Sequence, residues 1–468
     1  PSTADKRAFW IDKAGLRAHP LRRSRASLSA AMSTVILSAA SPELPALQDL
    51  SRVLRKELAR AGETEIRSFE LAQRKLGYCQ YERDCWVSST GRCHAHDMEQ
   101  EIVRAVHAAQ RVVILDRVTF GGYSYACKRA IDRLACLLLP FYEQRAALTP
   151  AGDFALGASF FALGWNPTPD AELSQTWSAL AEANAINLLA PRWGAACVSD
   201  VQQAGWPAAV SGMLRAAAQP GSGLLEREPL TLAARPASDP PPLCAVERAA
   251  LLIASPKPKG TSLSENLARA AQARLSRAGI ACELHFVTEL VEEPAAAETL
   301  ERLASAELFV LATPLYVDCL PALALRALEK LALRRTQGCD PGRFALLVHC
   351  GFPEPEQTRP ALRIARHFAH AARLHFAGAL PLGGGSGVDP RVPLDAQRGE
   401  TERIQRALDA ATAALAQGDD VPLEAIELMT RAPQPDVLDD LAAQLGFRYQ
   451  AYKSHLQQRE LSLPLAPD

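Results

Sequence analysis

The sequence has almost no net charge and no long apolar run, and each absence excludes a class of protein. Its 468 residues carry 51 Lys and Arg against 52 Asp and Glu, for a net charge of −1. Binding to nucleic acid or to an anionic membrane surface requires a basic excess, so neither partner is expected. The best candidate for a membrane span, Leu134 to Tyr142, is far shorter than the ~20 residues that a spanning helix needs.

The eleven cysteines form no regular framework. They are scattered singly, and several lie in apolar segments, as Cys136, Cys197, Cys282 and Cys350 do. This usage is typical of reduced thiols in a cytosolic compartment and not of a disulfide scaffold. We therefore expect a cytoplasmic protein.

Cys79, Cys85 and Cys93 come closest to a metal motif, with five and seven residues between them. An iron–sulfur cluster needs four thiolates, usually three of them in a compact run, so one ligand is missing. A zinc site that adds His94 or His96 has acceptable ligand types but no standard spacing. We expect no metal here and interpret the segment as a structural loop, although a redox role for its thiols stays open.

The loop between Ala254 and Leu263 is the most informative segment that is present. An apolar run ends at Ser255, turn-forming, basic and hydroxyl residues follow, and a helical pattern then begins. A helix N-terminus preceded by such a loop can hold a phosphate through main-chain N–H groups, hydroxyls and lysines. The order of residues is neither a Walker loop nor a GxGxxG motif, and it suits a monophosphate. The alternative interpretation is an ordinary solvated loop.

Much of the pattern occurs twice, which favours a tandem duplication. In each copy an apolar strand, a loop and a helix follow one another, and three strand matches keep the same order along the chain. The matched segments are 34–39 with 249–254, 112–134 with 309–331 (without a gap), and 153–159 with 343–349. A hydrophobic content of 48% is ample for two cores.

Both halves resemble the flavodoxin-like NADPH-dependent FMN reductases and their iron–sulfur flavoprotein relatives. The resemblance rests on the Ser255 to Ser264 loop, on Thr313 to Tyr316 with Pro321, and on Phe120 to Ser124. It implies an α/β fold of two tandem flavodoxin-like domains, each a doubly wound five-stranded parallel sheet. The boundaries that we predict are a disordered extension at 1–31, domain 1 at 32–218, a Pro-rich linker at 219–246, and domain 2 with a helical tail at 247–468.

The resemblance also implies an FMN site in the second half and no catalytic side chain, since the flavin carries the chemistry. The phosphate would lie over the first βα loop and the ring against the loops after the third and fourth strands. The expected cofactor-binding residues are Ser255, Lys257, Lys259, Thr261, Ser262, Ser264, Thr313, Pro314, Leu315, Tyr316, His349, Gly351 and Phe352. Among these, Tyr316 is the candidate for ring stacking, and His349 is either a proton donor or a structural residue.

The first half has lost this loop. The equivalent stretch keeps Ser38 and Ser41 but has no Lys, Arg, Gly or Thr, and Glu43 would repel a phosphate. We expect no FMN there. Members of the family are typically homodimers with the flavin near the subunit interface, so the halves are expected to pack as an intramolecular pseudo-dimer, with the Phe120 to Tyr125 loop near the second flavin pocket.

The function that the resemblance implies is an FMN-dependent NAD(P)H oxidoreductase. Hydride would pass from the nicotinamide through the flavin to a small-molecule acceptor such as a quinone or free flavin. Two alternatives stay open: a non-catalytic flavodoxin-like electron carrier, and an interaction scaffold that has lost the flavin.

Overall fold

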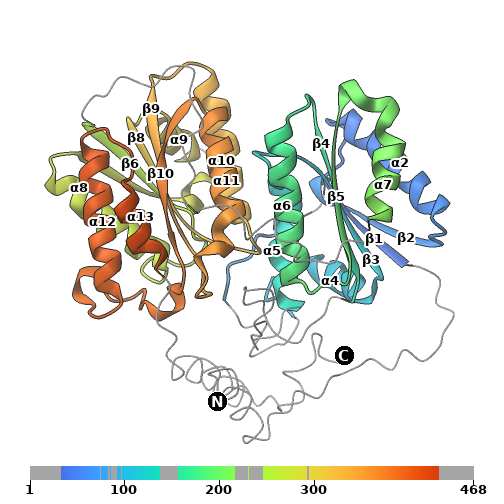
Figure 1. Cartoon of the computed structure of the whole chain (residues 1–468), viewed down its shortest axis with the longest axis horizontal. Helices are drawn as coiled ribbons and strands as arrows, with labels where there is room; N and C mark the ends of the chain where they lie inside the picture. The colour runs from blue at the N-terminus through green and yellow to red at the C-terminus, as the bar shows by residue number, and fades with distance from the viewer. Residues whose placement is uncertain are drawn as a thin grey trace, which may run out of the picture.

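The computed structural model describes residues 33–73, 75–82, 85, 92–95, 97–137, 157–216, 230, 246–291 and 295–431. These residues form two α/β lobes that lie side by side (Figure 1). The predicted extension at 1–31, the linker apart from Leu230 and Val246, and the helix expected at 434–457 lie outside the described residues.

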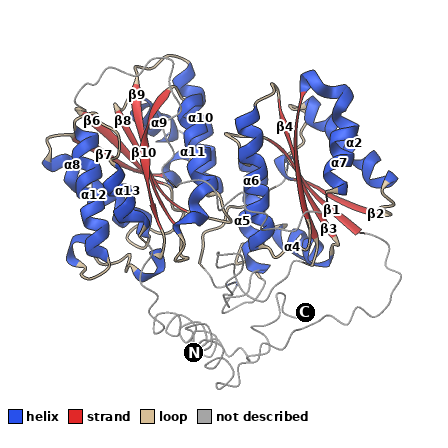
Figure 2. Cartoon of the chain, viewed as in Figure 1, coloured by secondary structure: helices blue, strands red, loops and turns tan. Residues whose placement is uncertain are grey.

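Each lobe is built on one parallel five-stranded sheet (Figure 2). The first contains β1 (Ser33–Ser38), β2 (Glu65–Glu70), β3 (Arg111–Arg117), β4 (Ser159–Asn166) and β5 (Trp193–Ser199), in the order β2-β1-β3-β4-β5. The second contains β6 (Arg248–Ile253), β7 (Ala281–Phe286), β8 (Leu308–Pro314), β9 (Gly342–His349) and β10 (Leu374–Leu382), in the order β7-β6-β8-β9-β10. Both orders are the 2-1-3-4-5 order of the flavodoxin-like fold, which confirms the predicted fold class.

The helices connect the strands and cover both faces of each sheet. In the first lobe they are α2 (Pro45–Arg60), α4 (Glu99–Ala108), α5 (Tyr125–Arg133), α6 (Ala171–Asn187) and α7 (Trp206–Arg215). In the second they are α8 (Leu263–Arg277), α9 (Ala295–Ala304), α10 (Ala322–Thr336), α11 (Arg359–Ala371), α12 (Thr401–Ala416) and α13 (Leu423–Thr430). The inner strands are continuous apolar runs, as in Val112 to Leu115 and Leu308 to Ala312, because helices bury both of their faces.

The predicted gapless match between 112–134 and 309–331 extends to the turn after each strand. Thr119 bridges Gly122, and Tyr316 bridges Cys319, at equivalent positions. The two central residues of each turn have positive φ: 52° and 81° for Phe120 and Gly121, and 42° and 59° for Val317 and Asp318. Such a pair is typical of a type I′ turn, which glycine accepts readily and valine does not.

The third predicted match was wrong in register. β4 begins at Ser159, which pairs with Arg111, and Arg343 of β9 pairs with Leu308. Ser159, and not Asp153, is therefore the counterpart of Arg343. The short apolar stretch before Gly157 resembled a strand in the sequence, but the run that pairs with both neighbouring strands is Phe160 to Leu163.

The two lobes contact each other through equivalent helices, α5 with α10 and α6 with α11 (Figure 1). α6 has buried residues on all sides, among them Trp177, Ala181 and Asn184, because the first sheet covers one face and α11 another. A helix that is buried all round lacks the single apolar stripe of a surface helix. None of the helices described combines the length and the apolar character needed to cross a bilayer.

Candidate functional site

The predicted site lies at the carboxyl edge of the second sheet, where β6 and β8 run side by side and their connections leave in opposite directions. Open α/β sheets bind ligands at such a switch point. The loop from Ser255 to Ser262 connects β6 to α8. Gly260 within it has a φ of 79°, and a side chain added there would meet open space, so glycine is required for the backbone conformation and not for packing.

The hydroxyls of this loop already make local hydrogen bonds. The Ser262 side chain caps α8 by accepting from the Glu265 N–H at 3.2 Å, and the Thr261 hydroxyl donates to the Pro258 carbonyl at 2.6 Å. Lys259 pairs with Glu289 at 3.2 Å and lies over the Phe286 ring. The loop is therefore held in one shape by its own groups, with the first N–H groups of α8 at its base.

Glu265 is a site residue that the sequence reasoning missed. Its carboxylate is buried in the loop, accepts from the Gly260 N–H at 2.5 Å, and pairs with Arg269 at 2.9 Å. It thus takes an N–H group that the prediction reserved for a phosphate. The signal was present in the sequence, because Ser262 followed three residues later by Glu265 is a capping-box pattern, which brings the glutamate back to the start of the helix.

His349 is where the three predicted loops meet. Its Nε2 lies 2.9 Å from the Ser264 hydroxyl of α8, and its carbonyl accepts from the Leu315 N–H after β8 at 2.8 Å. Burial, with Lys257 nearby, lowers the pKa of His349 to about 3. The imidazole is therefore neutral near pH 7, which favours the structural interpretation over that of a proton donor.

The loop after β8 places Tyr316 in the centre of the site. Its ring is buried, and its hydroxyl has no hydrogen-bond partner among the described residues. Burial raises the pKa of Tyr316 well above its usual value, so the phenol is neutral. The preceding Thr313 is also buried, and its hydroxyl donates to the Pro314 carbonyl at 3.1 Å.

Tyr81 of the first half lies on Tyr316. The two rings are stacked, with centroids 4.8 Å apart and planes 20° apart. The Lys257 ammonium is 5.2 Å from the Tyr81 ring centroid. Residues 75–82 of the first half thus reach the predicted ring site of the second. No local signal in the sequence indicated this contact, because it joins residues more than two hundred positions apart.

The loop after β9 is packed against the glycine run Gly383 to Gly387. The N–H groups of Gly384 and Gly385 donate to the carbonyls of Phe352 and Cys350 at 2.5 and 2.9 Å. A side chain at Gly383 would lie 2.4 Å from the Pro353 carbonyl. The run therefore supports the Cys350 to Phe352 loop, while a side chain added at Gly351 would meet nothing within 4 Å.

The first half also holds the main chain of the loop after β8, which contains Tyr316. The buried Lys128 ammonium donates to the Tyr316 carbonyl at 2.6 Å and pairs with Asp132. Asn184 donates to the Val317 carbonyl at 3.1 Å and to the Asp318 carboxylate at 2.8 Å, and the Tyr123 hydroxyl donates to Asn184 at 2.7 Å. The Phe120 to Tyr125 loop is thus linked through Asn184 to residues next to Tyr316.

The hydrogen-bond donors of this site fit FMN, but other groups of the chain already occupy part of the space that FMN would need. Lys257, the α8 N-terminus and the serines suit a phosphate. The buried Tyr316 hydroxyl, which has no partner in the part of the chain that the structure describes, suits a polar edge of a ring. However, Glu265 accepts a loop N–H, Ser264 bonds to His349, and Tyr81 covers one face of Tyr316. FMN would have to displace these groups.

The equivalent loop of the first half has a different character. The Ser38 hydroxyl accepts from the Ala40 N–H at 3.1 Å. Glu43 is fully exposed, and its hydrogen bond with the Ser41 side chain lowers its pKa, so it is ionised at neutral pH. α2 begins without a side-chain cap. Nothing basic among these residues would neutralise a phosphate.

Two thiols of the cysteine segment, Cys79 and Cys85, are neutral at pH 7. Burial, with Asp132 nearby, raises the pKa of Cys79 to about 12, and burial also raises the pKa of Cys85. Cys136 lies near this segment and hydrogen-bonds Glu99 at 3.4 Å. Among the described residues no three His, Cys, Asp or Glu side chains are arranged to hold a metal ion. Protonated thiols react slowly, so the raised pKa values of Cys79 and Cys85 favour the interpretation of this segment as a structural loop.

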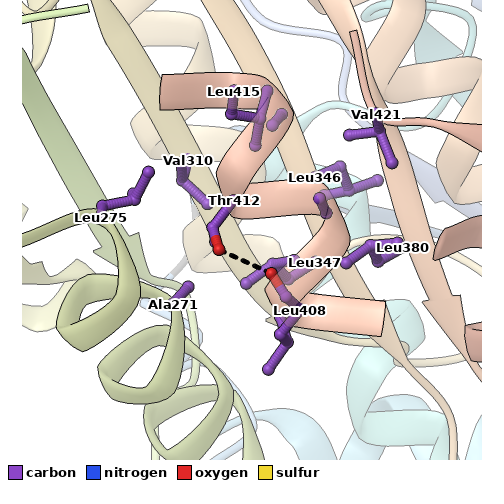
Figure 3. Close-up of a pocket in the computed structure, with 12 residues that line it drawn as sticks. Ala271, Leu275, Val310, Leu346, Leu347, Leu380, Leu408, Thr412, Leu415 and Val421 are labelled. Carbon is purple, nitrogen blue, oxygen red and sulfur yellow. Dashed lines mark hydrogen bonds between the residues drawn. The ribbon is translucent and has the colours of Figure 1, made fainter. Parts of the chain in front are cut away.

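A separate void lies inside the second lobe between α8, α12 and the sheet (Figure 3). Its volume of about 10 Å³ is no larger than one water, and leucine, valine and alanine side chains line most of it. The Thr412 hydroxyl beside it donates a hydrogen bond to the Leu408 carbonyl at 2.6 Å. It is a packing defect in the core and not a ligand site.

No protein-family model matches the chain, and no curated protein matches it. Three similar solved structures are azoreductase AzrA (14% identity, TM-score 0.26, 36% of this chain and 99% of that one), an FMN-dependent NADH-azoreductase from Bacillus anthracis str. Ames Ancestor in complex with FMN (13%, 0.27, 36% and 100%), and an NAD(P)H:quinone oxidoreductase from Methanothermobacter marburgensis (17%, 0.26, 36% and 100%). These are likenesses at low identity, and the fold assignment rests on the two sheets themselves.

Proposed function

We propose that the chain is an FMN-dependent NAD(P)H oxidoreductase that passes hydride from a nicotinamide through the flavin to a small-molecule acceptor, such as a quinone or free flavin. The observation that carries the proposal is the meeting of three loops at His349: the β6–α8 loop through Ser264, the β8 loop through Leu315, and His349 itself at the end of β9. This contact supports the proposal that the loops for phosphate and ring form one site at the switch point of the sheet.

In this proposal the phosphate lies over Ser255, Lys257, Lys259, Thr261, Ser262 and Ser264, and the ring lies against Thr313 to Tyr316, His349, Gly351 and Phe352. The flavin, when bound, supplies the hydride chemistry. The side chains bind and orient it: Lys257 offers charge to the phosphate, the neutral His349 fixes the Ser264 hydroxyl, and buried Tyr316 excludes water from one face.

We further infer that the halves form an intramolecular pseudo-dimer in which the first half binds no FMN and completes the site of the second. Equivalent helices meet at the interface, and Lys128 and Asn184 of the first half hold the main chain of the Tyr316 to Asp318 loop. Flavin content should then be one FMN per chain.

The test is to purify the chain in full, saturate it with FMN, and measure the bound flavin by its visible absorbance against protein concentration. A ratio of one supports the proposal, and a ratio of two contradicts the loss of the first site. Steady-state consumption of NADH and NADPH with a quinone acceptor then separates an enzyme from an electron carrier.

A second function has a specific observation in its favour. Tyr81 on Tyr316 and Glu265 in the phosphate loop close the site with the chain's own groups, as expected for a scaffold that has lost its flavin. Failure to bind FMN at saturating concentration, with the chain fully folded by circular dichroism, would favour this scaffold and contradict the oxidoreductase.

A further inference from the structure

Among the described residues of the first half, Tyr81 is the one whose ring stacks on a ring of the predicted flavin site. It lies between Tyr316, 4.8 Å away between centroids, and the Lys257 ammonium, 5.2 Å from its own centroid. Lys257 belongs to the predicted phosphate loop and Tyr316 to the predicted ring loop. One phenol ring therefore contacts both parts of the predicted site.

The segment that carries Tyr81 is anchored at its base to the first half. Arg129 donates to the carbonyls of Leu76 and Leu71 at 2.7 and 3.0 Å, and the Gly77 N–H donates to Asp97 at 2.8 Å. Tyr81 itself has a φ of 58°, a conformation that non-glycine residues rarely adopt. Its ring is held by stacking on Tyr316 and by the Lys257 ammonium. A flavin ring would stack on the same face of Tyr316, and the phosphate would take Lys257.

Resting on the proposed function, we propose that Tyr81 is a cover for the ring site: it occupies the face of Tyr316 that the flavin needs, and FMN binds by displacing it. The first half then sets the affinity of the second, because only the fraction of molecules with Tyr81 displaced can bind. The anchored base at Gly77 stays in place, and the ring of Tyr81 moves off Tyr316.

The experiment compares FMN binding by the full chain and by the Tyr81→Ala, Tyr81→Phe and Tyr81→Gly variants in equilibrium dialysis. Removing the ring removes the competitor, so Tyr81→Ala should bind FMN several-fold more tightly. Tyr81→Phe keeps the stacked ring and should bind as the unmodified chain does. Tyr81→Gly guards against misfolding, because glycine adopts the positive φ without strain, and it should also bind more tightly.

Hydrogen–deuterium exchange gives an independent readout of the same event. Exchange of residues 79–82, beyond the anchored base at Gly77, should rise when FMN is added, because Tyr81 is released from Tyr316. A fall in exchange on FMN addition, or weaker binding by Tyr81→Ala and Tyr81→Gly than by the unmodified chain, would overturn the cover and leave the oxidoreductase intact. Absence of FMN binding in all four proteins would overturn the proposed function and the cover with it.

Discussion

The Asp132 carboxylate accepts a hydrogen bond from the Ala322 N–H at 2.9 Å, so that a side chain of α5 in one half caps the first residue of α10 in the other. The relationship has a counterpart in the opposite direction, because the Tyr125 N–H at the start of α5 donates a hydrogen bond to the half-buried Glu329 carboxylate of α10. Each of these two equivalent helices thus supplies a carboxylate to the N-terminus of the other, where a negative charge interacts favourably with the helix dipole.

We expect Asp132→Asn to lower the free energy of unfolding by about 3–5 kcal/mol, because it leaves the fully buried Lys128 ammonium without its counter-charge. The measurement is urea denaturation followed by circular dichroism. Glu329→Gln is the matched control: its cationic neighbour Arg117 is exposed, so the charge left behind is solvated and the loss should be smaller. Equal losses would show that the caps, and not the Lys128 charge, dominate.

Much of the fold could be predicted from the sequence, because buried parallel strands and helix starts leave local patterns. The match of 112–134 with 309–331 predicted equivalent strands and helices, and the twin turns at Thr119 and Tyr316 agree with it. Less of the candidate site could be predicted from the sequence. Tyr81 and Asn184 reach the Tyr316 loop only through packing between the halves, and no periodicity in either segment encodes a partner so distant along the chain.

Glu265→Gln tests whether the buried carboxylate weakens phosphate binding. Removing its charge while keeping its shape should tighten FMN binding several-fold, because a phosphate carries a charge of about −2 and repels a carboxylate at close range. Riboflavin has no phosphate and serves as the control ligand, so its affinity should stay unchanged. A parallel gain for riboflavin would show that the substitution loosened the loop and did not relieve repulsion.

The stability of the chain should depend on the ionisation of Asp116. Burial raises its pKa to about 7, although it accepts hydrogen bonds from the Ser124 N–H and hydroxyl at 2.7 Å. Because the folded pKa lies above the ordinary value of 3.8, its contribution to stability is present at pH 4 and is lost as the pH rises to 7. The slope is at most about 1.4 kcal/mol per pH unit.

Asp116→Asn should remove this slope, since the amide does not titrate; its oxygen still accepts from the Ser124 N–H, and its NH2 group donates to the Ser124 hydroxyl oxygen. The measurement is the free energy of unfolding from pH 4 to pH 8 for the variant and the unmodified chain. Asp318→Asn is the comparison: burial raises the pKa of Asp318 from 3.8 to about 6, so this variant should lose only the contribution of Asp318 below pH 6 and keep the slope that Asp116 causes up to pH 7. Identical curves for the unmodified chain and Asp116→Asn would contradict the assignment.

The last prediction concerns the link from the first half to the ring loop through Tyr123. Its buried hydroxyl donates to the Asn184 carbonyl oxygen, and the Asn184 amide in turn holds the Val317 carbonyl and Asp318. Tyr123→Phe deletes one hydroxyl and keeps the ring that packs edge-on against Trp177, so it should cost only about 1 kcal/mol of stability. Freed from one contact, Asn184 should hold the loop less firmly, and the visible spectrum of bound FMN should shift although Tyr123 lies in the other half.

Thr176→Val is the control, because it also deletes a buried hydrogen bond between the halves, to His367, at a place that does not lead to Tyr316. If both variants change the flavin spectrum alike, the effect is a general loosening of the interface and not a connection through Asn184.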